Sequence, residues 1–252
     1  MDSELSTFKT QPKLDILVLA AHPDDAELGC SGTLLKYKAE GKKIGIIDLT
    51  RGELGTRGTA DTRKEEAAAA AEVLNLDIRE NLGMRDAFFK NDEEHQLQLI
   101  QKIRQYQPEI ILGNAPFDRH PDHGKAGSLI NDAAFLSGLP KIETFLNGES
   151  QKAWRPRLVL QFIQDAYIKP DIVIDVTDFW DQKMASIQAY KTQFYSPGNE
   201  ETGEEQTYIS TPGFVKVVEG RAREFGKHIG VTLAEGFVSK KILGVNDLFS
   251  LR

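Results

Sequence analysis

The chemistry of this sequence begins where an apolar run, Leu14 to Ala21, ends in His22-Pro-Asp24-Asp25. The run is rich in Leu, Ile and Val, which is typical of a strand covered on both faces of a parallel sheet. Open α/β sheets bind their ligands at the carboxyl ends of such strands. Three ionisable side chains within four residues need a partner at that position, and we expect a divalent metal ion.

A second cluster of the same kind follows another apolar run. Residues 109–113 have the composition of a buried strand, and the loop after them contains His120-Pro-Asp122-His123. The ends of two strands in one sheet can face a shared crevice, so we expect the two clusters to converge. One His-Pro pair is more often a polar turn than a metal site, because short motifs match many unrelated sequences. Two such clusters after two buried strands favour the metal site.

Three of these side chains match the ligand set of a catalytic zinc ion, which takes three histidine or carboxylate ligands and leaves one position for water. We predict His22, Asp25 and His123 as these ligands. Asp24 would then stay off the metal and act as a general base on the attacking water. His120 would stabilise or protonate the intermediate that this attack creates. The pattern therefore predicts metal-assisted hydrolysis.

The predicted strand-exit loops contain arginines that suggest an anionic substrate. They are Arg51, Arg57, Arg63 and Arg119. Arginine recognises carboxylate or phosphate through paired hydrogen bonds, although a single loop arginine is most often solvated. Arg221 differs, because it lies in an apolar stripe of the predicted last helix. There it requires an anionic or carbonyl partner, which is either a buried group of the protein or a ligand.

The order of the predicted elements indicates an α/β fold. Strands are predicted at 14–21, 44–49, 109–113, 157–164 and 171–176, with weaker ones at 77–82 and 231–239. Helices are predicted at 26–40, 62–74, 93–106, 124–137 and 214–228, and a further helix begins at 178. We expect Thr62 to open its helix through a capping box with Glu65, Asp178 to cap the next-to-last helix, and 231–239 to lie at the sheet edge. The early βαβ unit predicts a mostly parallel central sheet, with the metal site at the carboxyl ends of its strands.

Length and composition indicate a single domain. With 252 residues and 40% apolar composition, the chain can bury one substantial core, which we assign to residues 14–252 after a flexible lead-in at 1–13. Acidic and basic residues are mixed and the net charge is −7, which is not the footprint of a nucleic-acid-binding protein. One cysteine, Cys30, is typical of a reducing compartment, and no apolar stretch has the length of a membrane span. We therefore expect a cytoplasmic protein.

The two clusters together resemble a known family. Ala21-His22-Pro-Asp-Asp25-Ala-Glu27 with His120-Pro-Asp-His123 is similar to the motif pair of the LmbE-like (PIG-L-type) zinc deacetylases. Further segments are similar to one branch, the N-acetylglucosaminyl-malate deacetylases of bacillithiol synthesis: Asp48-Leu-Thr-Arg-Gly-Glu53, Thr62-Arg-Lys-Glu-Glu66 and Ala234-Glu-Gly-Phe237. The resemblance implies a Rossmann-like three-layer domain, one Zn²⁺ on His22, Asp25 and His123, and Asp24 as general base.

The resemblance also implies a substrate. It implies removal of acetate from N-acetyl-D-glucosaminyl L-malate, with Arg63 and Arg119 at positions associated with the malate carboxylates, and a homo-oligomer, often a hexamer. The alternatives are another N-acetylglucosamine conjugate, such as an oligosaccharide or an inositol conjugate, and a non-catalytic protein that binds metal or sugar. Asp24 disfavours the last, because a binding protein needs no unliganded base beside its metal.

One position departs from the family pattern. Some relatives carry a tyrosine near the start of the last helix that supports the oxyanion, and Phe214 stands there in this sequence. The candidates for that role are then Tyr208 and Tyr195 in the preceding loop, and the sequence does not distinguish them.

Overall fold

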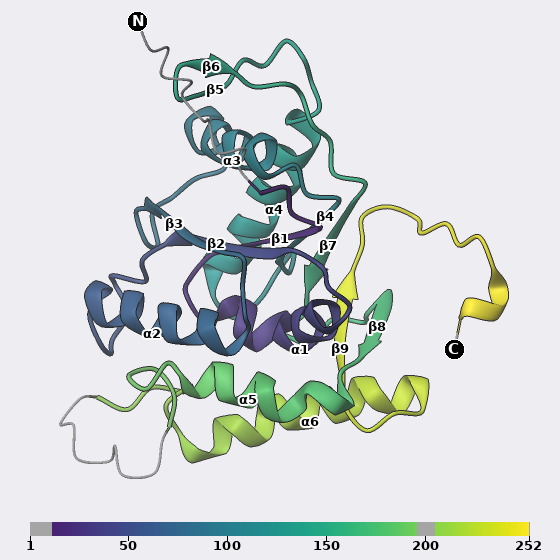
Figure 1. Cartoon of the computed structure of the whole chain (residues 1–252). Helices are drawn as coiled ribbons and strands as arrows, with labels where there is room; N and C mark the ends of the chain where they lie inside the picture. The colour runs from purple at the N-terminus through teal and green to yellow at the C-terminus, as the bar shows by residue number, and fades with distance from the viewer. Residues whose placement is uncertain (1–11, 196–204, 252) are drawn as a thin grey trace, which may run out of the picture.

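The computed structural model describes residues 12–195 and 205–251, so nearly all of the expected lead-in and part of the loop before the last helix lie outside the described residues. The centre of the described chain is a seven-stranded sheet in the order β3-β2-β1-β4-β7-β9-β8 (Figure 1). Its strands are β1 (Ile16–Ala20), β2 (Ile44–Thr50), β3 (Ile78–Met84), β4 (Ile110–Asn114), β7 (Leu158–Phe162), β8 (Ile172–Asp175) and β9 (Ala234–Val238). The first five strands in this order are parallel, which confirms the predicted α/β fold.

Helices cover both faces of the sheet. On one face lie α1 (Asp25–Ala39) and α2 (Ala60–Val73), and on the other α3 (Glu93–Tyr106) and α4 (Pro121–Leu136) (Figure 1). A further layer, α5 (Trp180–Gln188) and α6 (Pro212–Ile229), packs outside α1 and α2. The remaining elements are short: β5 (Phe145–Leu146), β6 (Glu149–Ser150), η1 (Thr177–Phe179) and η2 (Leu248–Ser250). None of the helices in the described part of the chain combines the length and apolarity that a membrane crossing needs.

Strand β1 is the centre of the core. All five of its residues are buried, because helices cover both faces of a parallel sheet. Leu17 and Leu19 pack into the core under α3 and α4, whereas Val18 and Ala20 pack into the core under α1. This double burial explains why the strand appears in the sequence as a continuous apolar run.

The prediction that residues 231–239 form an edge strand is wrong. β9 lies inside the sheet, antiparallel to both of its neighbours, β7 and β8, and β8 is the edge strand. Four of the five residues of β9 are buried, including Glu235. A charged residue in a strand usually indicates an exposed edge, but the charge of Glu235 is neutralised inside the protein.

Three helix starts also differ from the prediction. The capping box of α2 is formed by Thr59 and Thr62, three residues before the expected one, and no side chain caps η1 or α5, so Asp178 is not a cap. Helix α4 begins at Pro121 and not at 124, since proline is favoured in the first turn and the His120 ring accepts a hydrogen bond from the Asp122 amide. His123 therefore lies in the first turn of a helix and not in a loop.

A buried ion pair fastens the C-terminal elements to α1. Lys183 Nζ lies 2.7 Å from Glu235 Oε1 and also donates to the carbonyls of Glu27 and Leu28. Glu235 in turn accepts from the amides of Gly32 and Thr33 on the same helix. A Cβ at Gly32 would meet Val176 at 2.8 Å, so glycine permits this close approach. The pair therefore joins α5 and β9 to the helix that starts at Asp25.

We expect Lys183→Met to lower the free energy of unfolding by about 3–5 kcal/mol, because it leaves the Glu235 carboxylate buried without its cation. Denaturant unfolding followed by circular dichroism measures this. The control is Arg223→Met, which breaks an exposed pair with Glu219 and should cost less than about 1 kcal/mol. Equal losses in the two variants would contradict the structural role of the buried pair.

Candidate active site

The two polar clusters meet where the strand order reverses. From β1 the chain runs to β2 and β3 on one side, whereas β4 lies on the other side of β1. Such a reversal opens a crevice at the carboxyl ends of the two central strands. His22 follows β1, and His120 and His123 follow β4, so the predicted convergence is confirmed. Their rings lie together, with the centroids of His22 and His120 4.8 Å apart and those of His120 and His123 5.2 Å apart.

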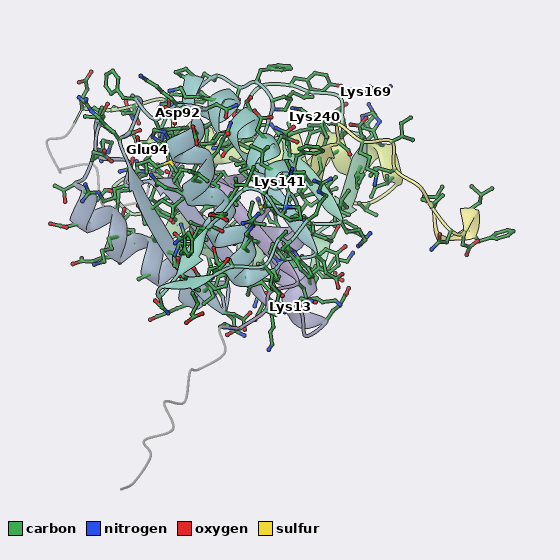
Figure 2. The ribbon with its side chains drawn as sticks, turned by 90° about the horizontal axis from the view of Figure 1, so that it is seen from above. Lys13, Asp92, Glu94, Lys141, Lys169 and Lys240 are labelled. Carbon is green, nitrogen blue, oxygen red and sulfur yellow. The ribbon has the colours of Figure 1, made fainter. Side chains whose placement is uncertain are left out.

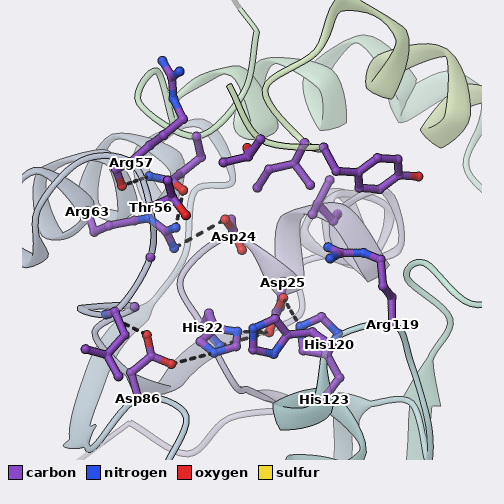
Figure 3. A pocket seen from close by; sticks show the side chains of 18 of the residues that line it. His22, Asp24, Asp25, Thr56, Arg57, Arg63, Asp86, Arg119, His120 and His123 are labelled. Atoms are coloured by element: carbon purple, nitrogen blue, oxygen red, sulfur yellow. Dashed lines mark hydrogen bonds and ion pairs between the residues drawn. The ribbon is translucent and has the colours of Figure 1, made fainter. Parts of the chain in front are cut away.

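A cavity of about 290 Å³ lies at this crevice (Figure 3). All five side chains predicted to perform the chemistry line it: His22, Asp24, Asp25, His120 and His123. Arg63, Arg119 and Tyr208 line it as well.

Asp25 lies between two imidazoles. Its Oδ2 is 3.5 Å from His22 Nδ1, and its Oδ1 is 3.1 Å from His123 Nε2. Two ligand atoms at about 2.1 Å from a tetrahedral zinc ion lie about 3.4 Å apart, so these spacings suit a shared cation. The Asp25 carboxylate also accepts hydrogen bonds from Asn114 Nδ2 and Gln164 Nε2, which fix its orientation.

Each imidazole has a carboxylate on its other nitrogen. His22 Nε2 lies 3.0 Å from Asp86 Oδ1 and 3.3 Å from Asp122 Oδ2, and His123 Nδ1 lies 2.7 Å from Asp118 Oδ2. Histidines that bind metals are typically oriented in this way, because the outer carboxylate fixes the tautomer and directs the free nitrogen at the ion. The nitrogens that face Asp25 are therefore the ones available to a metal.

The electrostatics of this group also suit a cation. Burial lowers the pKa of His123, but Asp25 and Asp118 outweigh burial and raise it to about 9. The pKa of His22 is likewise held well above its ordinary value by Asp122, Asp25 and Asp86, against the effect of burial. Without a metal the carboxylates thus retain protons on both rings, and a metal would have to replace these protons.

Within the described ranges, two groups have ligand atoms that all lie within 4.8 Å of one another: His22, His120 and His123, and His22, Asp86 and Asp122. Asp25 belongs to neither group, although it contacts both His22 and His123. Imidazole and carboxylate donors of this kind suit Zn²⁺ and related divalent ions. The residues present therefore fit a divalent metal.

Asp24 has a different environment from Asp25. Its backbone adopts a φ of 113°, which is unusual for a residue other than glycine and is found at strained functional sites. The side chain is buried, and burial raises its pKa to about 7, opposed by the Arg63 guanidinium 3.5 Å away. Arg63 also donates to the carbonyl of Pro23 at 3.0 Å and to Gln193, and these bonds hold the turn in place. Figure 3 shows the Arg63 guanidinium beside the Asp24 carboxylate.

His120 is suited to donate a proton while neutral. Its Nδ1 accepts a hydrogen bond from the Asp122 amide at 3.3 Å, so the proton of the neutral ring resides on Nε2. Burial and the neighbouring His22 and His123 lower its pKa. Near neutral pH the ring therefore carries one proton, on the nitrogen that this contact leaves free.

Two arginines contact Asp165, and one of them, Arg119, lines the cavity. Arg119 Nε lies 2.6 Å from Asp165 Oδ2, and Arg221 Nη2 donates to the Asp165 carbonyl at 2.7 Å. The partner predicted for Arg221 is therefore a group of the protein. Tyr208 joins this cluster, because its hydroxyl lies 3.4 Å from Asp165 Oδ1 and its ring lies 5.0 Å from the Arg119 guanidinium carbon.

Other candidates lie away from the cavity. Arg51 lines a separate hollow of about 490 Å³ beyond Pro23, and Tyr195 does not line the active-site cavity. Phe214 is buried and stacks on Phe194, with the Tyr208 ring against its edge. Of the two tyrosines considered for the missing family tyrosine, Tyr208 is the one at the cavity.

The residues that orient the predicted ligands were not predicted from the sequence. They are Asp86, Asn114, Asp118 and Gln164. All four follow or end the parallel strands β3, β4 and β7. Polar side chains at the carboxyl ends of parallel strands were the signal that could have identified them.

Known proteins resemble this chain in sequence and in structure. Residues 17–134 match the family model PIG-L, GlcNAc-PI de-N-acetylase. The conserved protein TT1542 from Thermus thermophilus superposes with a TM-score of 0.80 and 36% identity, over 92% of this chain and 98% of that one. Diacetylchitobiose deacetylase from Thermococcus kodakarensis is 28% identical over 71% of this chain and 70% of its own length.

Other relatives have different substrates. A probable N-acetyl-alpha-D-glucosaminyl L-malate deacetylase 2 from Bacillus subtilis is 25% identical over 72% of this chain and 84% of its own length. Relatives at similar identity include deacetylases of an inositol conjugate and a 4-oxalmesaconate hydratase from Pseudomonas putida. From the motif pair, the fold and these relatives together, the chain belongs to the PIG-L (LmbE-like) family of deacetylases.

Proposed function

We propose that this protein removes the acetyl group from an N-acetyl-D-glucosamine conjugate. In this proposal His22, Asp25 and His123 hold a divalent metal ion, for which zinc is the leading candidate. One observation carries the proposal. Asp25 lies between two imidazoles whose other nitrogens face carboxylates, and Asp24, the adjacent carboxylate, stays outside this group. A metal-binding protein without activity would not need a second, strained and buried carboxylate at the same cavity.

The residues divide the hydrolysis of the amide between them. When bound, the ion would polarise the acetyl carbonyl and make water a better nucleophile. Asp24 accepts a proton from the attacking water while the water oxygen bonds to the carbonyl carbon. His120 donates a hydrogen bond from Nε2 to the oxyanion. The C–N bond then breaks, the proton passes from Asp24 to the amine, and acetate and the free amino sugar leave.

For the substrate we propose an anionic aglycone, with N-acetyl-D-glucosaminyl L-malate and bacillithiol biosynthesis as the leading case. Arg119 lines the cavity and, together with Arg221, contacts the single carboxylate of Asp165, so this cluster holds two cations and one anion. The Bacillus relative supports the same choice. Oligosaccharide and inositol conjugates are the alternatives that other relatives support. We further propose a single-domain, cytoplasmic homo-oligomer, in which a hexamer is one possible assembly.

We expect Asp118→Asn to weaken metal binding about 10- to 100-fold, because the amide no longer orients His123 as a carboxylate does. Calorimetric titration of metal-free protein with Zn²⁺ measures the change. Asp132→Asn is the matched control, since Asp132 lies on α4, the helix of His123, but contacts Asn91 at the surface. Equal zinc affinity in both variants and the parent protein would argue against His123 as a ligand.

Asp24→Asn should retain zinc and lose deacetylation by about 10²- to 10⁴-fold, because the amide cannot accept the proton of water. Asparagine is preferred to alanine here, since it tolerates a positive φ and keeps the backbone of the turn. Zinc content by elemental analysis and the release of free amine are measured together. Full activity with full zinc would remove Asp24 from the mechanism.

Arg119→Ala should raise the KM for a malate conjugate about 10- to 100-fold, the effect of losing a hydrogen bond to a charged group. The KM for a neutral N-acetylglucosaminide should change little. Arg223→Ala, which alters an exposed helix pair away from the cavity, should leave both values unchanged. If Arg119→Ala raised both KM values equally, the anionic-aglycone proposal would be wrong, although the deacetylase chemistry could still hold.

A further inference from the structure

A second cavity lies beside the active site. It has a volume of about 490 Å³, compared with about 290 Å³ for the active-site cavity. Its walls come from the ends of β2 and β3 and from the first turns of α2, so it lies at the carboxyl ends of parallel strands, as the active site does. Pro23 lines this second cavity, whereas the neighbouring Asp24 lines the active site. The two cavities therefore lie on either side of one turn.

A β-bulge creates the space for the second cavity. Asp48 of β2 pairs with Asn81 of β3, and the next pair is Thr50 with Met84. Between these two pairs β3 has two residues and β2 has one. One of the two, Gly83, lines the second cavity with a φ of 64°, and a Cβ there would meet no atom within 4 Å. Bulges of this kind are frequent next to functional sites, so the opening is a candidate for a ligand.

Most of the charges that line the second cavity are neutralised by the protein itself. Arg79 Nε and Nη2 donate to the Asp48 carboxylate at 2.9 and 3.0 Å, and Arg79 Nη1 donates to Glu27 at 2.6 Å. Glu80 lies 2.7 Å from Lys102 Nζ. These groups complete their ion pairs within the chain and do not require a ligand.

Two further cations of the second cavity have no such partner. Within the residues that the structure describes, neither the Arg51 guanidinium nor the Lys64 ammonium forms an ion pair or a hydrogen bond. The exposed Asp61 is the remaining acidic group of the lining, so two cations face one anion. The sequence predicts Arg51 to recognise an anion, and the second cavity is the place where this arginine can do so.

We propose that the second cavity binds a small organic anion. Its carboxylate or phosphate group contacts Arg51 and Lys64, because charged hydrogen bonds to guanidinium and ammonium groups recognise both kinds of anion. Its apolar part packs on the apolar side chains of the lining, which are Ala67 and Ala68 of α2 and Leu82 of the bulge. None of the predicted metal ligands lines this cavity, so the site is separate from the active site.

The first experiment measures binding of matched probes to the full chain by isothermal titration calorimetry. The parent protein should bind benzoate or phenyl phosphate, and the tighter of the two identifies the charged group. Benzyl alcohol has the same ring without the charge and should not bind. Arg51→Met with Lys64→Met should weaken binding of the anion about tenfold or more, because charged hydrogen bonds are lost.

The control for this experiment removes two positive charges elsewhere. It is Lys169→Met with Lys240→Met, and Figure 2 shows these lysines near β8 and β9, which lie at the far end of the sheet from β3. This variant should bind the anion as the parent does. No binding of either anion, equally tight binding of benzyl alcohol, or equal affinity in the two double variants would overturn the proposal.

The second experiment locates the site by filling it. Ala68 and Ala69 are both exposed on α2, but only Ala68 lines the second cavity. Ala68→Phe should therefore abolish binding of the anion, and Ala69→Phe should leave it unchanged. Circular dichroism checks that both variants are folded. Full binding in Ala68→Phe would overturn the second cavity as the site. Neither experiment uses activity, so both outcomes are independent of the deacetylase proposal.

Discussion

The burial of the Asp25 carboxylate between two imidazoles is the constraint on which the site depends. A buried carboxylate is strongly disfavoured unless hydrogen bonds and positive charge compensate for lost water. Asp25 has both, because Asn114 and Gln164 donate to it and His22 and His123 lie beside it. Those imidazoles can supply positive charge only as imidazolium or as metal ligands. The outer carboxylates, which raise the pKa of both rings, therefore stabilise either state.

The fold places these charges where backbone dipoles help to stabilise them. Asp25 is the first residue of α1, and Asp122 lies in the first turn of α4. The positive end of a helix dipole favours carboxylates at such positions. Both helices follow central strands of the sheet. The reversal of strand order that brings the histidines together therefore also brings two helix N-termini to the crevice. The buried pair Lys183–Glu235 then secures α1 from the opposite side.

The sequence predicted the parts of this arrangement that depend on neighbours in the chain. Leu17 and Val18 belong to an apolar run because helices cover both faces of β1, and His22 follows that run directly. The position of β9 could not be predicted in this way, because Glu235 is neutralised by a lysine 52 positions away. The roles of Asp86 and Asp118 as partners of the histidines were not predicted for a similar reason. Each looks like an ordinary loop carboxylate until the fold places a histidine beside it.

Two adjacent aspartates illustrate how environment separates chemical roles. In Asp25, burial raises the pKa, but His123 and His22 more than offset it and leave the pKa well below its ordinary value. In Asp24 burial prevails over Arg63, and the pKa rises to about 7. The backbone turn at Asp24, with its positive φ, separates the two side chains so that they meet different partners. A carboxylate that stays ionised suits a ligand, and one that titrates near neutral pH suits a general base. The strain at Asp24 is thus best explained by the need to keep these two environments apart within one dipeptide.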